Sequence, residues 1–399
     1  MKRWWSHGLA LTVATVSAVV MFSVESPDAV VVVVTFTLGF GGLAYLAYRA
    51  GRSLAIGTSF VLIGLIVIPD LVAGATLAWH GADQDFVRYR SDVLAGSTGA
   101  VRTIIGLVWP LFIVFVWATR PKSPMVLSKS DGTAMWFLLL TALYMFSIYL
   151  KSFISILDTV IFVFLLAAFF WSIYRTRTPD QPDDSLRTNT SRYLMTATIV
   201  GVLAVVAIAI SSNWFVVNLS DAVYSSSGDS FKTVQWWFSL GSKVPILVVV
   251  WVMVQHARSG QVVTGLLTGH FVLIATTLAV IPMLYLVRTA ALGGANSFVL
   301  DDSQRTELLL AAAQSVFFVV LLARMVATLK TAVALFVLFL VQLVLSAVQP
   351  GGQVTLVQTL LAGGYIGSAL LIMLADRSRL HVMLDALPTQ GIKLLRKDK

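Results

Sequence analysis

Residues 55–79 read AIGTSFVLIGLIVIPDLVAGATLAW, an almost unbroken apolar run with a proline and an aspartate near its centre. A helix needs about 20 apolar residues to cross the hydrocarbon core of a bilayer, so this run is long enough to span it. Residues 234–254 repeat the pattern as VQWWFSLGSKVPILVVVWVMV, with Lys243 and Pro245 near the centre. The two runs predict a membrane protein whose helices are interrupted beside ionisable residues.

The composition of the 399-residue chain agrees with this prediction. Hydrophobic residues make up 58% of the chain and charged residues 12%, with a mean hydropathy of +0.87. Soluble proteins carry about 25% charged residues, so the composition excludes a water-soluble globular protein. The apolar runs are continuous and do not alternate with polar residues, which excludes a transmembrane β-barrel. The absence of cysteine excludes disulfides and thiolate metal sites.

Apolar runs of transmembrane length recur along the whole chain. We count about twelve of them in the sequence: 9–24, 30–48, 55–79, 103–118, 134–149, 153–174, 194–217, 234–254, 262–287, 308–323, 331–348 and 354–374. We therefore predict an all-α polytopic membrane protein with about 12 transmembrane helices.

The positions of the basic residues predict the orientation. With the amino terminus inside, 20 of the 28 Lys and Arg residues fall in inside loops and tails and 6 in outside loops. Short basic loops stay in the cytoplasm, so both termini are predicted to be cytoplasmic. The basic tail is interpreted as a membrane anchor and not as a nucleic-acid patch. The basic start of the first run also resembles a signal peptide, but no clear cleavage site follows, and we expect that helix to be uncleaved.

A polar interval near the middle of the chain predicts a two-part organisation. Residues 175–193, rich in Pro, Asp, Thr and Arg, are interpreted as a cytoplasmic linker. Five runs lie before it in residues 30–174 and five after it in residues 194–348. An odd number of helices per half inverts the second half relative to the first, as in many secondary transporters. Residues 1–29 and 349–399 then supply one extra helix at each end and a basic tail.

The second run of each half contains the candidate site. Pro69 stands beside Asp70 in one run, and Pro245 stands two residues after Lys243 in the other. Proline removes a helical hydrogen bond, and matched interruptions in two halves point to a substrate site near the bilayer midplane. Ionisable groups inside a span face the protein interior and are paired, so we expect Asp70 and Lys243 to form a salt bridge. A purely structural role for the prolines or for the salt bridge remains an alternative.

The neighbouring runs add polar candidates to this site. Ser97, Thr98 and Arg102 precede the third run, Ser242 adjoins Lys243, and His270 lies in the run that follows. Hydroxyls can coordinate an ion or water, and a histidine can carry a proton near neutral pH. Helix packing alone also explains the small residues, and a simple hydrogen-bonded role also explains the histidine. Asp158 is a further acid at the membrane level, and its role is left open.

The pattern around these residues resembles the cation/calcium antiporter superfamily, the sodium/calcium exchanger fold, and most closely its prokaryotic sodium:proton or sodium:calcium exchangers. The resemblance covers roughly residues 34–342. Its most specific stretches are 97–110 (STGAVRTIIGLVWP) and 303–322 (SQRTELLLAAAQSVFFVVLL). It implies two inverted five-helix repeats and a prokaryotic cytoplasmic membrane.

The chain departs from the family at the ion site. The resemblance implies a Pro-Glu carboxylate in each repeat; here the first becomes Pro69-Asp70, and Lys243 and Ile246 stand where two glutamates are expected. The supporting asparagines and one further acid are replaced by Gly96, Val101, Val272 and Tyr48, while Thr98 and Arg102 remain. Calcium takes 6–8 oxygen ligands, so calcium exchange by the family mechanism is not expected, and we predict no metal site.

The functional hypothesis is a secondary transporter that moves an ion or small solute by alternating access, with Asp70 and Lys243 as a charge-compensated central pair. Its expected partners are the lipid bilayer and sodium, protons or another small ion. The alternative is a transport-inactive relative that serves as a membrane scaffold or partner-binding subunit. An aqueous cavity at the pair would favour transport, and a dry, packed pair would favour the scaffold. No catalytic motif, phosphate loop or histidine cluster is present in the sequence, so we predict neither an enzyme nor a cofactor.

Overall fold

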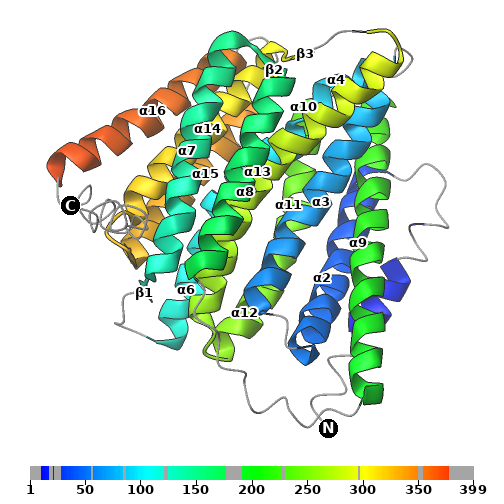
Figure 1. The fold of residues 1–399 in the computed structure, drawn as a ribbon, viewed down its shortest axis with the longest axis vertical. Helices are drawn as coiled ribbons and strands as arrows, with labels where there is room; N and C mark the ends of the chain where they lie inside the picture. The colour runs from blue at the N-terminus through cyan, green and yellow to red at the C-terminus, as the bar shows by residue number, and fades with distance from the viewer. Residues whose placement is uncertain are drawn as a thin grey trace, which may run out of the picture.

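The computed structural model describes residues 10–17, 21, 28–54, 57–83, 87–120, 125–176, 191–225, 230–294, 297–348 and 354–376. Within these ranges, eleven helices are long and apolar enough to cross a membrane. They run side by side in one bundle (Figure 1). The predicted polytopic α-helical membrane fold is confirmed. The first predicted run is described only in part, with residues 10–17 helical. Most of the predicted linker and the basic tail lie outside the described residues.

Nine of the eleven spans in the described part of the chain are single helices. They are α2 (Ala29–Ser53), α3 (Thr58–Gly81), α7 (Lys129–Lys151), α8 (Ile156–Thr176), α9 (Ser191–Ser225), α13 (Ser259–Ala291), α14 (Asp302–Leu322), α15 (Leu329–Val348) and α16 (Val354–Ala375).

The other two spans are segmented and contain π-helical turns. After the short helix α4 (Val87–Asp92), one consists of α5 (Ala95–Thr103), η2 (Ile104–Val108) and α6 (Trp109–Thr119). The other consists of α10 (Ser230–Thr233), η4 (Val234–Phe238), α11 (Ser239–Lys243) and α12 (Ile246–Gln255), with Pro245 between α11 and α12. π-Helical turns are rare and often mark functional positions.

The sequence placed the start of the third span too late. The predicted run begins at residue 103, but α5 extends the helix back to Ala95. Residues 95–103 are small or polar and are all buried. They pack against other helices and not against lipid, so hydropathy alone could not identify them as part of a span.

Two short strand pairs, which the sequence did not predict, lie at opposite ends of the bundle (Figure 1). Strand β1 (Met125–Val126) pairs with β4 (Val326–Ala327), and β2 (Phe153–Ser155) pairs with β3 (Ser297–Val299), both antiparallel. We call the two ends of the bundle the β1–β4 end and the β2–β3 end. Since β2 directly precedes α8 and β3 precedes α14, both helices start at the β2–β3 end.

Capping boxes fix the start of the helix that follows β1 and of the one that follows β3. At α7 the Ser128 side chain accepts from the Asp131 backbone N–H, and Asp131 accepts from the Ser128 N–H. At α14, Asp301 and Gln304 form the same reciprocal pair. Each box satisfies backbone donors that a helix start leaves free.

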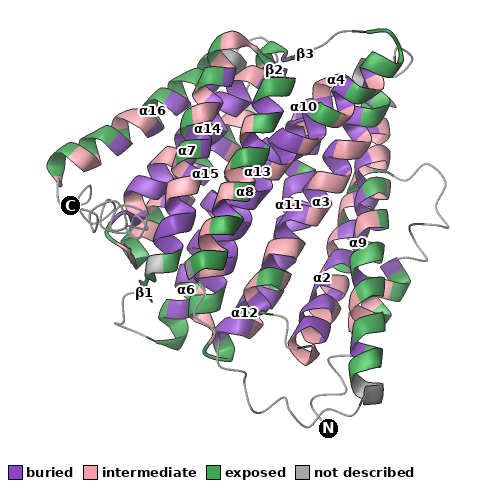
Figure 2. Cartoon of the chain, in the orientation of Figure 1, coloured by how far each residue is buried: buried purple, intermediate pink, exposed green. Residues whose placement is uncertain are grey.

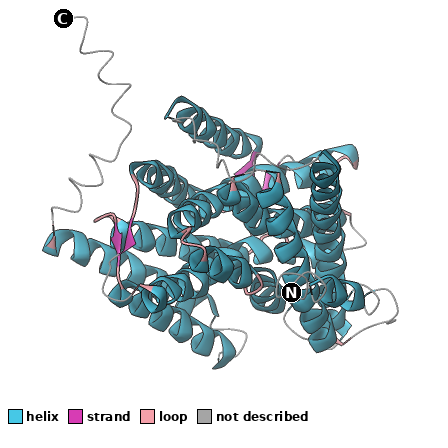
Figure 3. Ribbon diagram, turned by 90° about the horizontal axis from the view of Figure 1, so that it is seen from below, coloured by secondary structure: helices cyan, strands magenta, loops and turns pink. Residues whose placement is uncertain are grey.

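Helix packing separates a buried centre from lipid-facing helices. α3 packs along α13, α5 contacts η4 and α11, and α2 packs against α9. Figure 2 shows buried residues concentrated where these helices face one another, whereas α8, α9 and α16 carry many exposed residues. Seen from below, the bundle consists almost entirely of helices (Figure 3). The interrupted helices thus lie inside the bundle.

Candidate functional site

The centre of the bundle contains an ion pair between two helices that lie far apart in the sequence, α3 and α11. Asp70 lies midway along α3, and Lys243 is the last residue of α11. The Lys243 Nζ donates to Asp70 Oδ2, and both side chains are fully buried. Of the predicted site residues, these two are the ones that the structure brings together as an ion pair.

The proline in α3 accompanies an unusual hydrogen bond at this point. The sequence predicted an interruption here, but α3 runs continuously through Thr58–Gly81 with Pro69 inside it. Pro69 has no N–H, so α3 lacks one backbone hydrogen bond, the one to the Leu65 carbonyl four residues earlier. In the turn before Pro69 the backbone carbonyl of Ile66 accepts a hydrogen bond from Lys243 Nζ, at 2.7 Å. The ammonium group therefore has two oxygen partners on α3.

The carboxylate of Asp70 is only half satisfied. Its Oδ1 atom is buried and has no hydrogen-bond partner among the described residues. An unpaired buried polar atom is costly, and such atoms in native structures often mark a water, ion or proton position.

The remaining residues of α11 continue the polar character of this site. Ser242, next to Lys243, is fully buried, and its hydroxyl donates to the Ser239 carbonyl at 3.3 Å. Pro245 begins the next helical segment and packs against Gly41 of α2. Ser242 and Pro245 are therefore neighbours of the ion pair without contacting Asp70 in any hydrogen bond of the described residues.

Arg102 takes part in a different ion pair, which was not predicted from the sequence. Its Nη2 donates to Glu307 Oε2 of α14, and both side chains are buried. The Arg102 guanidinium also lies over the Trp236 ring, 4.7 Å from its centroid. Glu307 follows the polar residues Ser303-Gln304-Arg305-Thr306, so in the sequence it resembles a solvent-exposed residue at the start of a helix. The available signal was that Arg102, at the edge of an apolar run, required an acidic partner.

The helix α16 is tied to this second pair. The Gln358 Nε2 donates to Glu307 Oε1, and the Thr306 hydroxyl donates to Gln358 Oε1 at 2.8 Å. Further along α16, the Tyr365 hydroxyl accepts from Gln314 and Gln342 at 3.3 and 2.9 Å. Buried polar groups of α16 are thus integrated into the bundle.

Ser97, Thr98 and His270 take separate positions. The Thr98 hydroxyl accepts from Gln235 Nε2 at 3.1 Å, and Ser97 lines a small cavity with Thr277. His270 is fully buried in α13, with neither ring nitrogen bonded to any described residue, and its ring lies 5.9 Å from that of Phe318. None of the three contacts Asp70 or Lys243 through a hydrogen bond in the described part of the chain.

Asp158 is held by hydrogen bonds at the start of α8. It lies in the first turn of α8 and accepts hydrogen bonds from Tyr144, Lys151 and the backbone and side chain of Ser155. These contacts join α8 to the end of α7 at the β2–β3 end. Asp158 is therefore at a helix terminus and away from the central pair.

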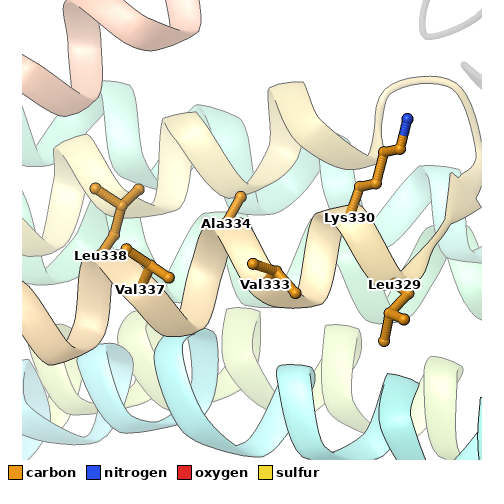
Figure 4. A pocket seen from close by; sticks show the side chains of 6 residues that line it. All are labelled: Leu329, Lys330, Val333, Ala334, Val337 and Leu338. Atoms are coloured by element: carbon orange, nitrogen blue, oxygen red, sulfur yellow. The ribbon is translucent and has the colours of Figure 1, made fainter.

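The two largest hollows described in this part of the chain do not reach the central pair. One, of about 550 Å³, is an open hollow on the surface of α15, lined by Val333, Val337 and four other residues of that helix (Figure 4). Another, of about 430 Å³, lies between residues 11–17 and 21, α2 and α9. Neither cavity is lined by Asp70 or Lys243, which are 1% and 0% exposed. The pair is sealed in this structure.

No cluster of three or more histidine and acidic residues with metal-site geometry occurs in the part of the chain that the structure describes. The central site instead offers one carboxylate, held by one ammonium group. Such a set does not resemble the oxygen-rich coordination that calcium requires.

Comparison with known proteins identifies the fold. Neither a scan of protein-family models nor a search of curated protein sequences finds a match. Among solved structures, the H+/Ca2+ exchanger CAX is similar, with a TM-score of 0.77, 24% identity, and coverage of 96% of this chain and 97% of the exchanger.

Two further structures are similar over most of their length. The sodium-calcium exchanger NCX_Mj has a TM-score of 0.54 at 12% identity, covering 84% of this chain and 98% of that one. YfkE has a TM-score of 0.57 at 14% identity, covering 84% of this chain and 97% of that one. The resemblance inferred from the sequence is confirmed at the level of the fold: the chain has the fold that CAX, NCX_Mj and YfkE share.

Proposed function

We propose that this protein is a secondary transporter that exchanges a monovalent cation for a proton by alternating access, with Asp70 and Lys243 as its central pair. The observation that carries the proposal is the fully buried ion pair between α3 and α11. Burying charges is costly, and membrane spans retain them mainly where they serve transport or proton transfer. The fold, which this chain shares with solved cation exchangers, supports the same class of function.

The composition of the site favours a monovalent cation. Lys243 holds the place of a cation on the Asp70 carboxylate, and that carboxylate is the one acid of the pair. A divalent ion would need several more oxygen ligands than one carboxylate and a helix carbonyl supply. A monovalent cation carries the same single positive charge as the Lys243 ammonium group that it would replace.

Charge balance then determines the exchange. An arriving cation binds the free Oδ1 atom of Asp70 and displaces Lys243 from the carboxylate. Lys243 thereby loses the ion pair with Asp70 that stabilised its positive charge in the buried site. The proton leaves Lys243 Nζ for the same side from which the cation came, and the site crosses the membrane with no net charge. After the cation leaves on the far side, Lys243 takes a proton there and pairs again with Asp70. One cation thus exchanges for one proton because a net charge on the dry site is unfavourable.

An inverted repeat supplies the two access states. Three paired features support it. The second span of each part contains a proline, Pro69 inside the continuous helix α3 and Pro245 between α11 and α12. A strand pair lies at each end of the bundle, and a capping box starts both α7 and α14. Two structurally similar halves of opposite orientation can exchange conformations around a fixed central site.

We also propose a prokaryotic cytoplasmic membrane with both termini inside. In this orientation the β1–β4 end faces the cytoplasm and the β2–β3 end faces outward. The basic residues Arg258, Arg324 and Lys330 then lie on the cytoplasmic side, as short basic loops do.

A second candidate is a transport-inactive membrane scaffold or partner-binding subunit. The observation that favours it is the sealing of Asp70 and Lys243, which line neither of the two large cavities. A sealed pair is also what an occluded transporter presents. The scaffold predicts no ion flux under any gradient.

The test is ion flux in proteoliposomes that contain a pH-sensitive dye. Sodium, potassium, lithium and calcium gradients are imposed in turn on wild type and on Asp70→Asn. The proposal expects at least one monovalent cation to drive a proton movement that Asp70→Asn abolishes. Folded wild-type protein without flux for any cation, or flux that persists in Asp70→Asn, would contradict it and favour the scaffold or another site.

A further inference from the structure

A second buried carboxylate lies between the central pair and the β2–β3 end. Glu307 is in the second turn of α14, which starts at that end, and its partner Arg102 is in α5. Both Glu307 oxygens are engaged, Oε2 with Arg102 and Oε1 with Gln358. The transport chemistry proposed above does not use this pair, although it is as buried as the pair at the centre.

A polar face of the interrupted helix connects the two pairs. Gln235, Ser239, Ser242 and Lys243 are all buried, and their spacing of four, seven and eight residues places them on one side of a helix. The Ser239 hydroxyl donates to the Gly96 carbonyl at 3.2 Å, and Ser242 donates to the Ser239 carbonyl. This face runs from the Glu307 level to Lys243.

Gln235 is the link at the Glu307 end. Its amide nitrogen donates to the Thr98 hydroxyl at 3.1 Å, and Thr98 stands four residues before Arg102, the partner of Glu307, in α5. The π-helical turn η4 contains Gln235, which is consistent with a position that serves more than packing. Polar groups therefore continue from Glu307 to Lys243.

The remaining surroundings of this helix are apolar. Phe36 of α2 stacks on Phe215 of α9, with ring centroids 4.1 Å apart, and Phe238 lies 5.3 Å from Phe215. Gly96 packs against the Phe238 ring. The aromatic cluster covers one side of the helix, so the polar face is the route with ligands for an ion.

Arg102 has an alternative partner if it releases Glu307. Its guanidinium already lies over the Trp236 ring, where a cation–π interaction stabilises a charge without a carboxylate. Its Nε atom has no hydrogen-bond partner among the described residues. An arriving cation can thus replace Arg102 on Glu307 while the guanidinium stays over the indole.

We propose that Glu307 is a second cation-binding carboxylate, an entry station for a monovalent cation moving from the β2–β3 end to Asp70. Arg102 occupies the station when it is empty, as Lys243 occupies the central one. Gln358 and Gln235 are positioning residues: the Gln358 amide nitrogen holds the Glu307 carboxylate, and the Gln235 amide nitrogen holds Thr98 on the helix that carries Arg102. This inference rests on the proposed function.

The test compares transport from the two faces of the membrane. The double variant Arg102→Gln/Glu307→Gln removes the station without leaving an unpaired buried charge. Lys151→Gln/Asp158→Asn is the matched control, because that pair lies at the same end of the bundle but off the polar face. Sodium-driven proton flux is measured against sodium concentration in right-side-out and everted membrane vesicles.

The expected result is one-sided. The station variant raises the half-saturating sodium concentration about tenfold or more from the β2–β3 face, the effect of losing one charged ligand, and leaves the other face unchanged. The control pair changes neither face. If the station variant does not fold, Gln235→Leu carries the same one-sided expectation with both charges still paired.

Other outcomes overturn the inference in distinguishable ways. Unchanged half-saturation on both faces, or an equal rise on both, would contradict the station while wild-type flux preserves the proposed exchange. Absence of flux in wild type would overturn both, since a station without transport has no cargo.

Discussion

The Nζ atom of Lys243 lies 2.7 Å from the backbone carbonyl oxygen of Ile66, in the turn of α3 that precedes Pro69. The same atom is bonded to Asp70, one turn further along α3. Lys243 is therefore bound to the helix backbone as well as to the carboxylate. This double attachment explains how a buried lysine is stabilised at the centre of the bundle, and it determines how substitutions should behave.

Single neutralisation of the pair should destabilise the protein, and double neutralisation should not. Lys243→Met leaves a buried carboxylate without a cation, which costs roughly 3–5 kcal/mol, whereas Asp70→Asn/Lys243→Met removes both charges at little cost. Thermal unfolding in detergent measures the difference. The account expects the double variant to unfold near the wild-type temperature and Lys243→Met well below it. Equal loss in both variants would mean that the charges do not stabilise each other.

Transport should be electrically silent. Each crossing moves either the Asp70–Lys243 ion pair or a bound cation with neutral Lys243, so the site carries no net charge in either direction. Proton flux driven by sodium should then be independent of a membrane potential clamped with potassium and valinomycin. A rate that changes steeply with the clamped potential would show that net charge moves and would exclude the one-for-one exchange.

Gly99 should be intolerant of even a methyl group. A Cβ at this position would collide with the Gln235 backbone carbonyl and the Ser239 hydroxyl, so α5 and the interrupted helix approach without room for a side chain. Gly99→Ala should cost about 1–3 kcal/mol and reduce transport, as overpacking does. A Cβ added at Gly367 of α16 would meet no atom within 4 Å, so Gly367→Ala is the control and should be neutral or slightly stabilising. Similar unfolding temperatures for the two variants would contradict the close approach.

The cysteine-free chain permits a direct test of the orientation. Val126 of β1 and Val299 of β3 are exposed and lie at opposite ends of the bundle. With both termini in the cytoplasm, Val299→Cys should react with a membrane-impermeant maleimide in intact cells. Val126→Cys should react only after the cells are permeabilised. The reverse labelling pattern would invert the orientation and place the Glu307 station on the cytoplasmic side.

The sequence predicted the central residues because their signals are local. Pro69 and Asp70 stand out in an apolar run, and Lys243 and Pro245 do so in another. Charges inside membrane spans are rare enough that two of them at matched positions predict a pair. The membrane fold followed in the same way from the length of the apolar runs.

The second pair could not be predicted from such signals. Glu307 belongs to a polar helix start, and only the packing of α14 against α5 places it beside Arg102. The residues of α5 are buried by other helices and lack the apolar character of a lipid-facing span. A hydropathy profile detects segments that face lipid. It therefore misses helical segments that contact only protein, as α5 does.

The central claim is that a cation and the Lys243 proton compete for Asp70. Adding sodium, or whichever cation drives flux, to the purified protein in weakly buffered detergent solution with a pH dye tests this directly. The account predicts release of about one proton per chain on saturation, and no release from Asp70→Asn/Lys243→Met. Cation binding by the wild type without proton release would contradict the competition and with it the proposed exchange.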